Sequence, residues 1–125
     1  MKTMIDTCAW IDFLRSKEGR TGDQVAQLIE LGNAVICDVI ITELLQGAKG
    51  HKEKSQLEFL FDTVELQSVI GEDWVNAGHL LQGLRLKGLT LPLTDALIAV
   101  VAKRNSLPVL TIDKHFKYLP VELIE

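Results

Sequence analysis

Cysteine and long apolar runs are scarce in this chain, and each scarcity excludes a class of protein. The two cysteines, Cys8 and Cys37, are too few for the disulfide framework of a secreted mini-protein, and no CxxC spacing suggests a zinc finger. The longest apolar run, 96–102, is far shorter than the roughly 20 residues that a membrane-spanning helix needs. Asp6 and Asp12 interrupt any signal-like start. We therefore expect a protein of the reducing cytoplasm, neither membrane-bound nor exported.

Signatures of nucleotide cofactors and of acyl transfer are also missing, because the chain has no Walker loop, GxGxxG turn or GxSxG elbow. Its net charge of −4 argues against a protein that holds nucleic acid by bulk charge alone. The basic residues nevertheless form three short clusters: Lys49, Lys52 and Lys54; Lys103 and Arg104; and Lys114 and Lys117. Each cluster taken singly is typical of a solvated surface, although together they could hold phosphates that flank a cleavage site.

What the chain does have is enough apolar material for one core. Its 125 residues, of which 47% are apolar, suit a single domain that needs no disulfide or structural metal to stay folded. No repeat, low-complexity tract or Gly/Ser linker divides the sequence. We therefore expect one domain over residues 1–125.

Short apolar strands alternate with amphipathic helices along the chain. The strand candidates are 2–6, 34–37, 64–70, 108–112 and 121–124. Apolar residues spaced three or four apart predict helices at 10–14, 21–32, 38–47, 57–61, 74–88 and 94–104. Such alternation implies right-handed crossovers and a parallel sheet covered on both faces. The predicted fold class is α/β, a three-layer α/β/α sandwich with a central parallel sheet of about five strands.

Two of the predicted helices begin with capping signals. Thr21 and Gln24 have the spacing of a capping box, and Gly32 is placed to end that helix. Asp38 can cap the next helix. The alternative for this segment is a longer strand through Ile41.

Four carboxylates fall where a parallel sheet binds ligands, beyond the carboxyl ends of its strands. Asp6 closes the first strand, and Asp113 follows the fourth. Asp95 lies in the first turn of the helix that starts after Pro92, and Glu43 lies one turn inside the helix after the second strand. If the first and fourth strands are neighbours, these acids can converge at one rim.

Each acid taken alone also has an ordinary explanation. Asp95 could be an N-terminal acid favoured by the helix dipole, an effect of roughly 0.3 to 1 kcal/mol. A solvated position on the helix surface suits Glu43 about equally well. Together, however, like charges within a few ångströms repel one another unless protons or a cation offset them. A hard cation such as Mg²⁺ or Mn²⁺ suits an all-oxygen cluster.

A hard divalent ion in an acidic crevice can activate water, neutralise a scissile phosphate and stabilise the leaving oxygen. This chemistry cleaves phosphodiesters, and it would let a protein of negative net charge accept an RNA chain. Zinc is disfavoured, because the histidines have no ligand spacing. We interpret all three as surface or helix-face residues: His51, His79 and His115.

Four short motifs carry a family resemblance. They are residues 4–15 (MIDTCAWIDFLR), 42–48 (TELLQGA), 93–99 (LTDALIA) and 110–116 (LTIDKHF). In order and spacing they resemble the PIN-domain ribonucleases, most closely the VapC-type toxins of bacterial toxin–antitoxin pairs. The resemblance covers essentially the whole chain and implies a PIN-like version of the predicted sandwich.

The resemblance also implies a set of functional residues. The family's metal-binding and catalytic acids correspond to Asp6, Glu43, Asp95 and Asp113. Its hydroxyls correspond to Thr7 and Thr111, for which capping or local hydrogen bonding to the backbone is an equally good explanation. Cys8 departs from the small polar residue that is common at its position, and a thiol there neither supplies a hard ligand nor excludes one.

The resemblance further implies an activity and partners. The activity is Mg²⁺- or Mn²⁺-dependent endonucleolytic cleavage of RNA by a toxin. The partners are a second copy in a homodimer and a small inhibitory antitoxin. The apolar faces of 54–61 and 74–84 could form these contacts, with packing in the single core as the alternative.

Two other functions compete with a ribonuclease. A binding-only module would keep the crevice without the activity, holding for example a partner's arginine against the acids. A signalling receiver domain shares the length, the parallel sheet and an acidic Mg²⁺ pocket. Receiver domains, however, pair acids after the first strand and place an Asp after the third, whereas Asp6 has no acidic neighbour and 68–71 contains no Asp.

Overall fold

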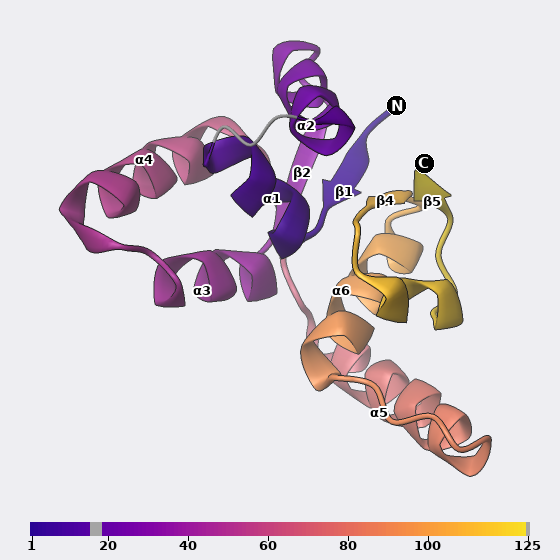
Figure 1. The fold of residues 1–125 in the computed structure, drawn as a ribbon. Coiled ribbons are helices and arrows are strands. Elements are labelled where there is room, and N and C mark those ends of the chain that lie inside the picture. Colours follow the sequence, from indigo (N-terminus) through magenta and orange to yellow (C-terminus); the bar gives the residue numbers. More distant parts are fainter. Residues whose placement is uncertain (16–18, 125) are drawn as a thin grey trace.

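A five-stranded parallel sheet forms the centre of the protein, as the sequence predicts (Figure 1). The structure is a computed structural model and describes residues 1–15 and 19–124. Within these residues the strand order is β3-β2-β1-β4-β5, and every neighbouring pair is parallel. The strands are β1 Thr3–Ile5, β2 Ala34–Cys37, β3 Glu65–Gln67, β4 Val109–Leu110 and β5 Leu123–Ile124.

Helices cover both faces of this sheet. In the described part of the chain they are α1 Thr7–Leu14, α2 Arg20–Glu30, α3 Asp38–Gln46, α4 Gly50–Thr63, α5 Gly71–Leu86, α6 Leu93–Arg104 and the 3₁₀-helix η1 Lys114–Tyr118. In Figure 1, α1 to α4 lie on one side of the sheet, and α6, with α5 packed against it, lies on the other. Among the helices described, none is long and apolar enough to cross a membrane.

The core explains why α6 is so strongly apolar. Every residue from 96 to 102 is buried, because one side of α6 packs on the sheet and the other on α5. Strands β1 and β2 are buried at every position, as expected for a sheet covered on both faces. Each large apolar side chain buried in this way contributes about 1.5–3 kcal/mol to folding.

The order in which strands are added to the sheet reverses between β1 and β4, and the site lies at this switch point. The chain builds β1, β2 and β3 outward in one direction and then crosses to the other side of β1 for β4. The ladder pairs Ile5 with Leu110, and the Asp6 amide donates to the Leu110 carbonyl at 3.0 Å. Ligands of open parallel sheets bind at such a switch point. The condition for the acids to converge, that the first and fourth strands are neighbours, is therefore met.

The predicted capping box at the start of α2 is wrong. The helix begins at Arg20, and its N-cap is Gly19, with φ of 145°. Thr21 therefore lies inside the first turn, where its hydroxyl cannot serve as the cap. Glycine replaces the expected hydroxyl because only glycine adopts this backbone conformation readily.

Asp38 has a different role from the predicted cap. The N-cap of α3 is Cys37, and Asp38 is the first helical residue, so the alternative of a strand through Ile41 is also wrong. The Asp38 Oδ1 accepts hydrogen bonds from the Val39 and Val69 amides, each at 3.1 Å. Strand β3 covers Glu65–Gln67 and so ends earlier than the predicted 64–70, and the Val69 amide beyond it bonds to the Asp38 side chain.

Candidate active site

Asp6 lies at the carboxyl end of β1 and is buried, with 4% of its surface exposed. It occupies the N-cap of α1, yet its side chain makes no capping hydrogen bond. Its Oδ2 instead accepts hydrogen bonds from Thr111 Oγ1 at 2.8 Å and from Cys8 Sγ at 3.4 Å. Burial raises the pKa of Asp6, these bonds and a backbone bond from Thr7 oppose the rise, and the charge of Asp113 adds to it.

Asp95 comes from the opposite side of the sheet, in the first turn of α6 after the N-cap Pro92. It is buried as well, with 7% exposed. Burial, followed by the charges of Asp113 and Asp6, raises the pKa of Asp95 to about 6, against the opposing effect of His115. Asp6, Asp95 and Asp113 therefore act on one another although they come from three separate segments.

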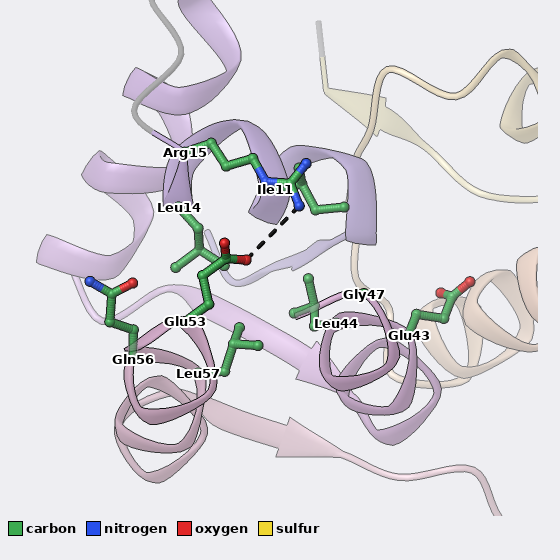
Figure 2. Close-up of a pocket in the computed structure, with 9 residues that line it drawn as sticks. All are labelled: Ile11, Leu14, Arg15, Glu43, Leu44, Gly47, Glu53, Gln56 and Leu57. Carbon is green, nitrogen blue, oxygen red and sulfur yellow. Dashed lines mark ion pairs between the residues drawn. The ribbon is translucent and has the colours of Figure 1, made fainter. Parts of the chain in front are cut away.

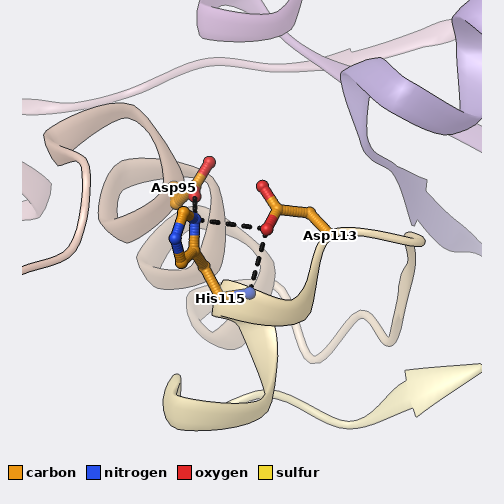
Figure 3. Close-up of side chains that lie close together, drawn as sticks. All are labelled: Asp95, Asp113 and His115. Atoms are coloured by element: carbon orange, nitrogen blue, oxygen red, sulfur yellow. Dashed lines mark hydrogen bonds and ion pairs between the residues drawn. The ribbon is translucent and has the colours of Figure 1, made fainter.

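Asp113 is the N-cap of η1, where its Oδ1 accepts a hydrogen bond from the backbone amide of His115 at 2.9 Å. The His115 ring turns back onto the acids, with Nδ1 3.2 Å from Asp95 Oδ2 and 3.2 Å from Asp113 Oδ1 (Figure 3). The interpretation of His115 as a surface residue without ligand spacing is therefore incomplete. The ring is half exposed but belongs to the acidic cluster, and an acid-x-His spacing at a strand end was the available signal.

Glu43 stands further from this group than the sequence suggests. It lies on α3, and its Oε1 accepts a hydrogen bond from Thr7 Oγ1 at 2.7 Å. Because Thr7 directly follows Asp6, the hydroxyl links Glu43 to the same rim. The ligand atoms that lie within 4.8 Å of one another belong to Asp95, Asp113 and His115.

Thr111 ties the acids of two neighbouring strands together. Its hydroxyl donates to Asp6 and accepts from the Asp113 backbone amide at 2.9 Å. Cys8 Sγ lies 3.4 Å from this hydroxyl and accepts from the Ile112 amide at 3.4 Å. Burial and the charge of Asp6 raise the pKa of the Cys8 thiol, so it stays protonated as a donor to Asp6.

The chemistry of these side chains fits a divalent cation. Among residues 1–15 and 19–124, no lysine or arginine pairs with Asp6, Asp95 or Asp113. Burial raises the pKa of both Asp6 and Asp95, and the charges of the neighbouring aspartates add to the rise. Clustered carboxylates of this kind hold hard ions such as Mg²⁺ and Mn²⁺. The donor set therefore agrees with the ions that the sequence suggests.

A separate pocket lies between α1, α3 and α4 (Figure 2). Its lining includes Ile11, Leu44 and Leu57, and an ion pair joins Arg15 Nη2 to Glu53 Oε1 at 3.9 Å. Glu43 also lines this pocket, but Figure 2 shows its carboxylate pointing away from the ion pair. The pocket thus borders the acidic rim without containing the three coupled aspartates.

Fold and site together define a class of protein, a parallel α/β domain with carboxylates gathered at its switch point. The family model described as PIN domain matches residues 3–122. The chain belongs to the PIN domain family, in agreement with the four motifs. The alternative of a receiver domain is therefore wrong.

Solved toxin–antitoxin structures share this fold. VapBC2 from Rickettsia felis, bound to a DNA fragment from its promoter, is 22% identical with a TM-score of 0.82, covering 100% of this chain and 98% of that chain. DNA-bound VapBC from Salmonella typhimurium has the same identity and TM-score, covering 100% and 97%. Mycobacterium tuberculosis VapC20, a toxin that cleaves the sarcin-ricin loop, is 15% identical with a TM-score of 0.75, covering 99% of each chain. No curated protein sequence matches significantly.

Proposed function

We propose that this chain is a metal-dependent endoribonuclease and the toxin of a toxin–antitoxin pair. The observation that carries the proposal is the convergence of Asp6, Asp95 and Asp113 from three separate segments. Burial and the neighbouring charges raise the pKa of Asp6 and of Asp95, and within the described residues no lysine or arginine pairs with any of the three. Membership of the PIN domain family supports nuclease chemistry at this place. The similar VapC20, described as cleaving the sarcin-ricin loop, supports RNA as the substrate.

The position of each side chain in the site indicates its role in the proposed reaction. Asp6, Asp95 and Asp113 would hold Mg²⁺ or Mn²⁺, and Glu43 would complete the acidic rim from α3. When bound, the ion would offset the charge of the scissile phosphate and activate a water for its hydrolysis. Thr111 fixes the orientation of the Asp6 carboxylate, and Thr7 fixes that of Glu43.

RNA must approach this acidic rim with local help from basic residues. Lys114 and Lys117 are exposed on η1, directly after Asp113, and suit contacts to flanking phosphates. Arg104 does not suit this role. Its guanidinium donates to Asp73 at 2.8 and 3.0 Å and to the Ser68 carbonyl at 2.9 Å, so it is already committed to the fold.

Two partners belong to the proposal. An antitoxin is supported by the similar VapBC proteins, and a second copy is supported by exposed apolar side chains on α5, where Trp74 is 54% and Val75 60% exposed. On α4, by contrast, Leu57 and Leu60 pack in the core and leave Phe59 exposed. Much of that apolar face therefore packs in the core, which is the alternative that the sequence left open for 54–61.

Cleavage of cellular RNA by purified protein supplied with Mg²⁺ or Mn²⁺ tests this function. Asp6→Asn and Asp95→Asn should each lower the cleavage rate by about a hundredfold or more, because each removes charge from where the transition state needs it. The matched control is Asp62→Asn, an exposed acid on α4. Sequencing the RNA ends after brief expression would identify the target.

Two results would contradict the proposal. Unchanged cleavage by both site variants would remove the catalytic assignment. Divalent-ion binding without any RNA cleavage by the wild type would instead favour the binding-only module.

A further inference from the structure

The site contains one nitrogen donor that a purely acidic cluster would lack. His115 Nδ1 lies 3.2 Å from an oxygen of Asp95 and 3.2 Å from an oxygen of Asp113. Figure 3 shows one ring nitrogen facing both carboxylates, with the other nitrogen turned away from them. One donor atom from each of these three residues lies within 4.8 Å of the others.

The backbone holds this ring in place. The His115 amide donates to Asp113 Oδ1 at 2.9 Å, and the next residue, Phe116, is fully buried in the core. His115 is therefore fixed at its amide by an acid of the cluster and followed by an anchored aromatic side chain. This arrangement fixes the backbone of His115 beside the acids, at a place from which Nδ1 reaches both carboxylates.

The distances match those between ligands of one ion. Adjacent donors around an octahedral ion with bonds of about 2.1 Å are about 3.0 Å apart. The two nitrogen–oxygen separations are 3.2 Å, so a small movement of the side chains would bring them to this value. Imidazole is a ligand for transition ions, whereas Mg²⁺ prefers oxygen donors and retained waters.

We propose that His115 supplies a nitrogen ligand, through Nδ1, to the divalent ion of this site and that the ligand makes the site prefer Mn²⁺ over Mg²⁺. This inference rests on the metal site of the proposed function and adds a selectivity that carboxylates alone would not give. His115 is then a specificity-determining residue, and RNA cleavage is not needed to detect its effect.

Calorimetric titration with Mn²⁺ alone and with Mg²⁺ alone measures the preference. His115→Ala should weaken Mn²⁺ binding by at least about tenfold, a typical cost of losing a metal-site partner. Its Mg²⁺ affinity should change much less, so the ratio of the two affinities falls. His115→Gln is the second variant, because it keeps a polar side chain of similar reach, and His51→Ala on α4 is the matched control.

Pulsed electron paramagnetic resonance of the Mn²⁺-bound protein tests the ligand itself. The wild type and His51→Ala should show a ¹⁴N coupling from a bound imidazole, and both His115 variants should lose it. Mn²⁺ binding without this coupling, or an unchanged affinity ratio in His115→Ala, would overturn the inference alone. If neither Mn²⁺ nor Mg²⁺ binds, the metal site of the proposed function is overturned as well.

Discussion

Asp73 and Asp95 are both buried acids at the starts of helices, yet they have opposite surroundings. Asp73, fully buried at the start of α5, accepts two hydrogen bonds from the Arg104 guanidinium and one from the Ile70 amide at 2.9 Å. Burial acts to raise the pKa of Asp73, but the Arg104 and Ile70 bonds lower it overall. At Asp95 burial and two neighbouring aspartates act in the same direction, and the pKa rises to about 6.

The chain supplies its own cation to Asp73 and leaves the cation at the switch point to be supplied from solution. Arg104 on α6 forms an ion pair with Asp73 on α5 and so neutralises the buried carboxylate. At the switch point of the sheet, the acids repel one another, and within residues 1–15 and 19–124 the one basic side chain that faces them is that of His115. A cluster that costs stability in the metal-free protein is expected where the cost is recovered on binding a cation.

The largest expected loss of stability comes from removing the cation that pairs with Asp73. Arg104→Ala should lower the free energy of unfolding by about 3–5 kcal/mol, because it leaves Asp73 charged, buried and without its cation. Urea denaturation measures the loss. Lys103→Ala, an exposed neighbour on α6, is the matched control, and an equal effect of both substitutions would show that Asp73 does not depend on Arg104.

For Asp95→Asn we expect the opposite change, a higher free energy of unfolding, in protein that a chelator has freed of metal. Because folding raises the pKa of Asp95 from 3.8 to about 6, the folded state binds more protons than the unfolded state in this interval. Stability of the wild type should therefore fall as the pH rises from about 4 to above 6. At about pH 7.5 the variant should be more stable by up to about 3 kcal/mol.

Urea denaturation at both pH values checks this sign. The advantage of Asp95→Asn should shrink at about pH 4, where the wild-type carboxyl also carries a proton. The exposed Asp62→Asn should gain nothing at either pH. A variant less stable than the wild type at neutral pH would mean that the acids are already compensated within the chain.

The smallest effect is expected at an ion pair that is exposed to solvent, in contrast to the buried pair of Asp73 and Arg104. Lys2, just before the central strand β1, forms an ion pair with Glu65 in the edge strand β3, and their side chains are 55% and 36% exposed. Lys2→Ala should lower stability by less than about 1 kcal/mol, because water screens exposed charges. Chemical denaturation at low and high salt would show it, and a loss as large as that of Arg104→Ala would refute burial as the deciding variable.

The sequence predicted the parts of the fold that follow from local pattern. The apolar run in α6 and the short alternating strands predict the parallel sheet, whereas the adjacency of β1 and β4 was only a condition that the fold then meets. On that condition, Asp6, Asp95 and Asp113 could be placed at one rim. Glu43 could be assigned to its helix, but its link through Thr7 depends on packing.

The remaining features depend on distant partners that no local pattern specifies. Asp73 and Arg104 are 31 positions apart, as are Asp38 and Val69. His115 meets Asp95 across 20 positions only because η1 turns the ring back over the strand end. Each of these contacts requires the whole fold before the two groups can meet.

Diffraction from crystals grown with Mn²⁺, recorded where manganese scatters anomalously, tests the central claim most directly. The account predicts an anomalous peak within ligand distance of the Asp95 and Asp113 carboxylates and on the side that faces Asp6. Crystals in which manganese occupies another place, or none, while these three acids contact only water would contradict it.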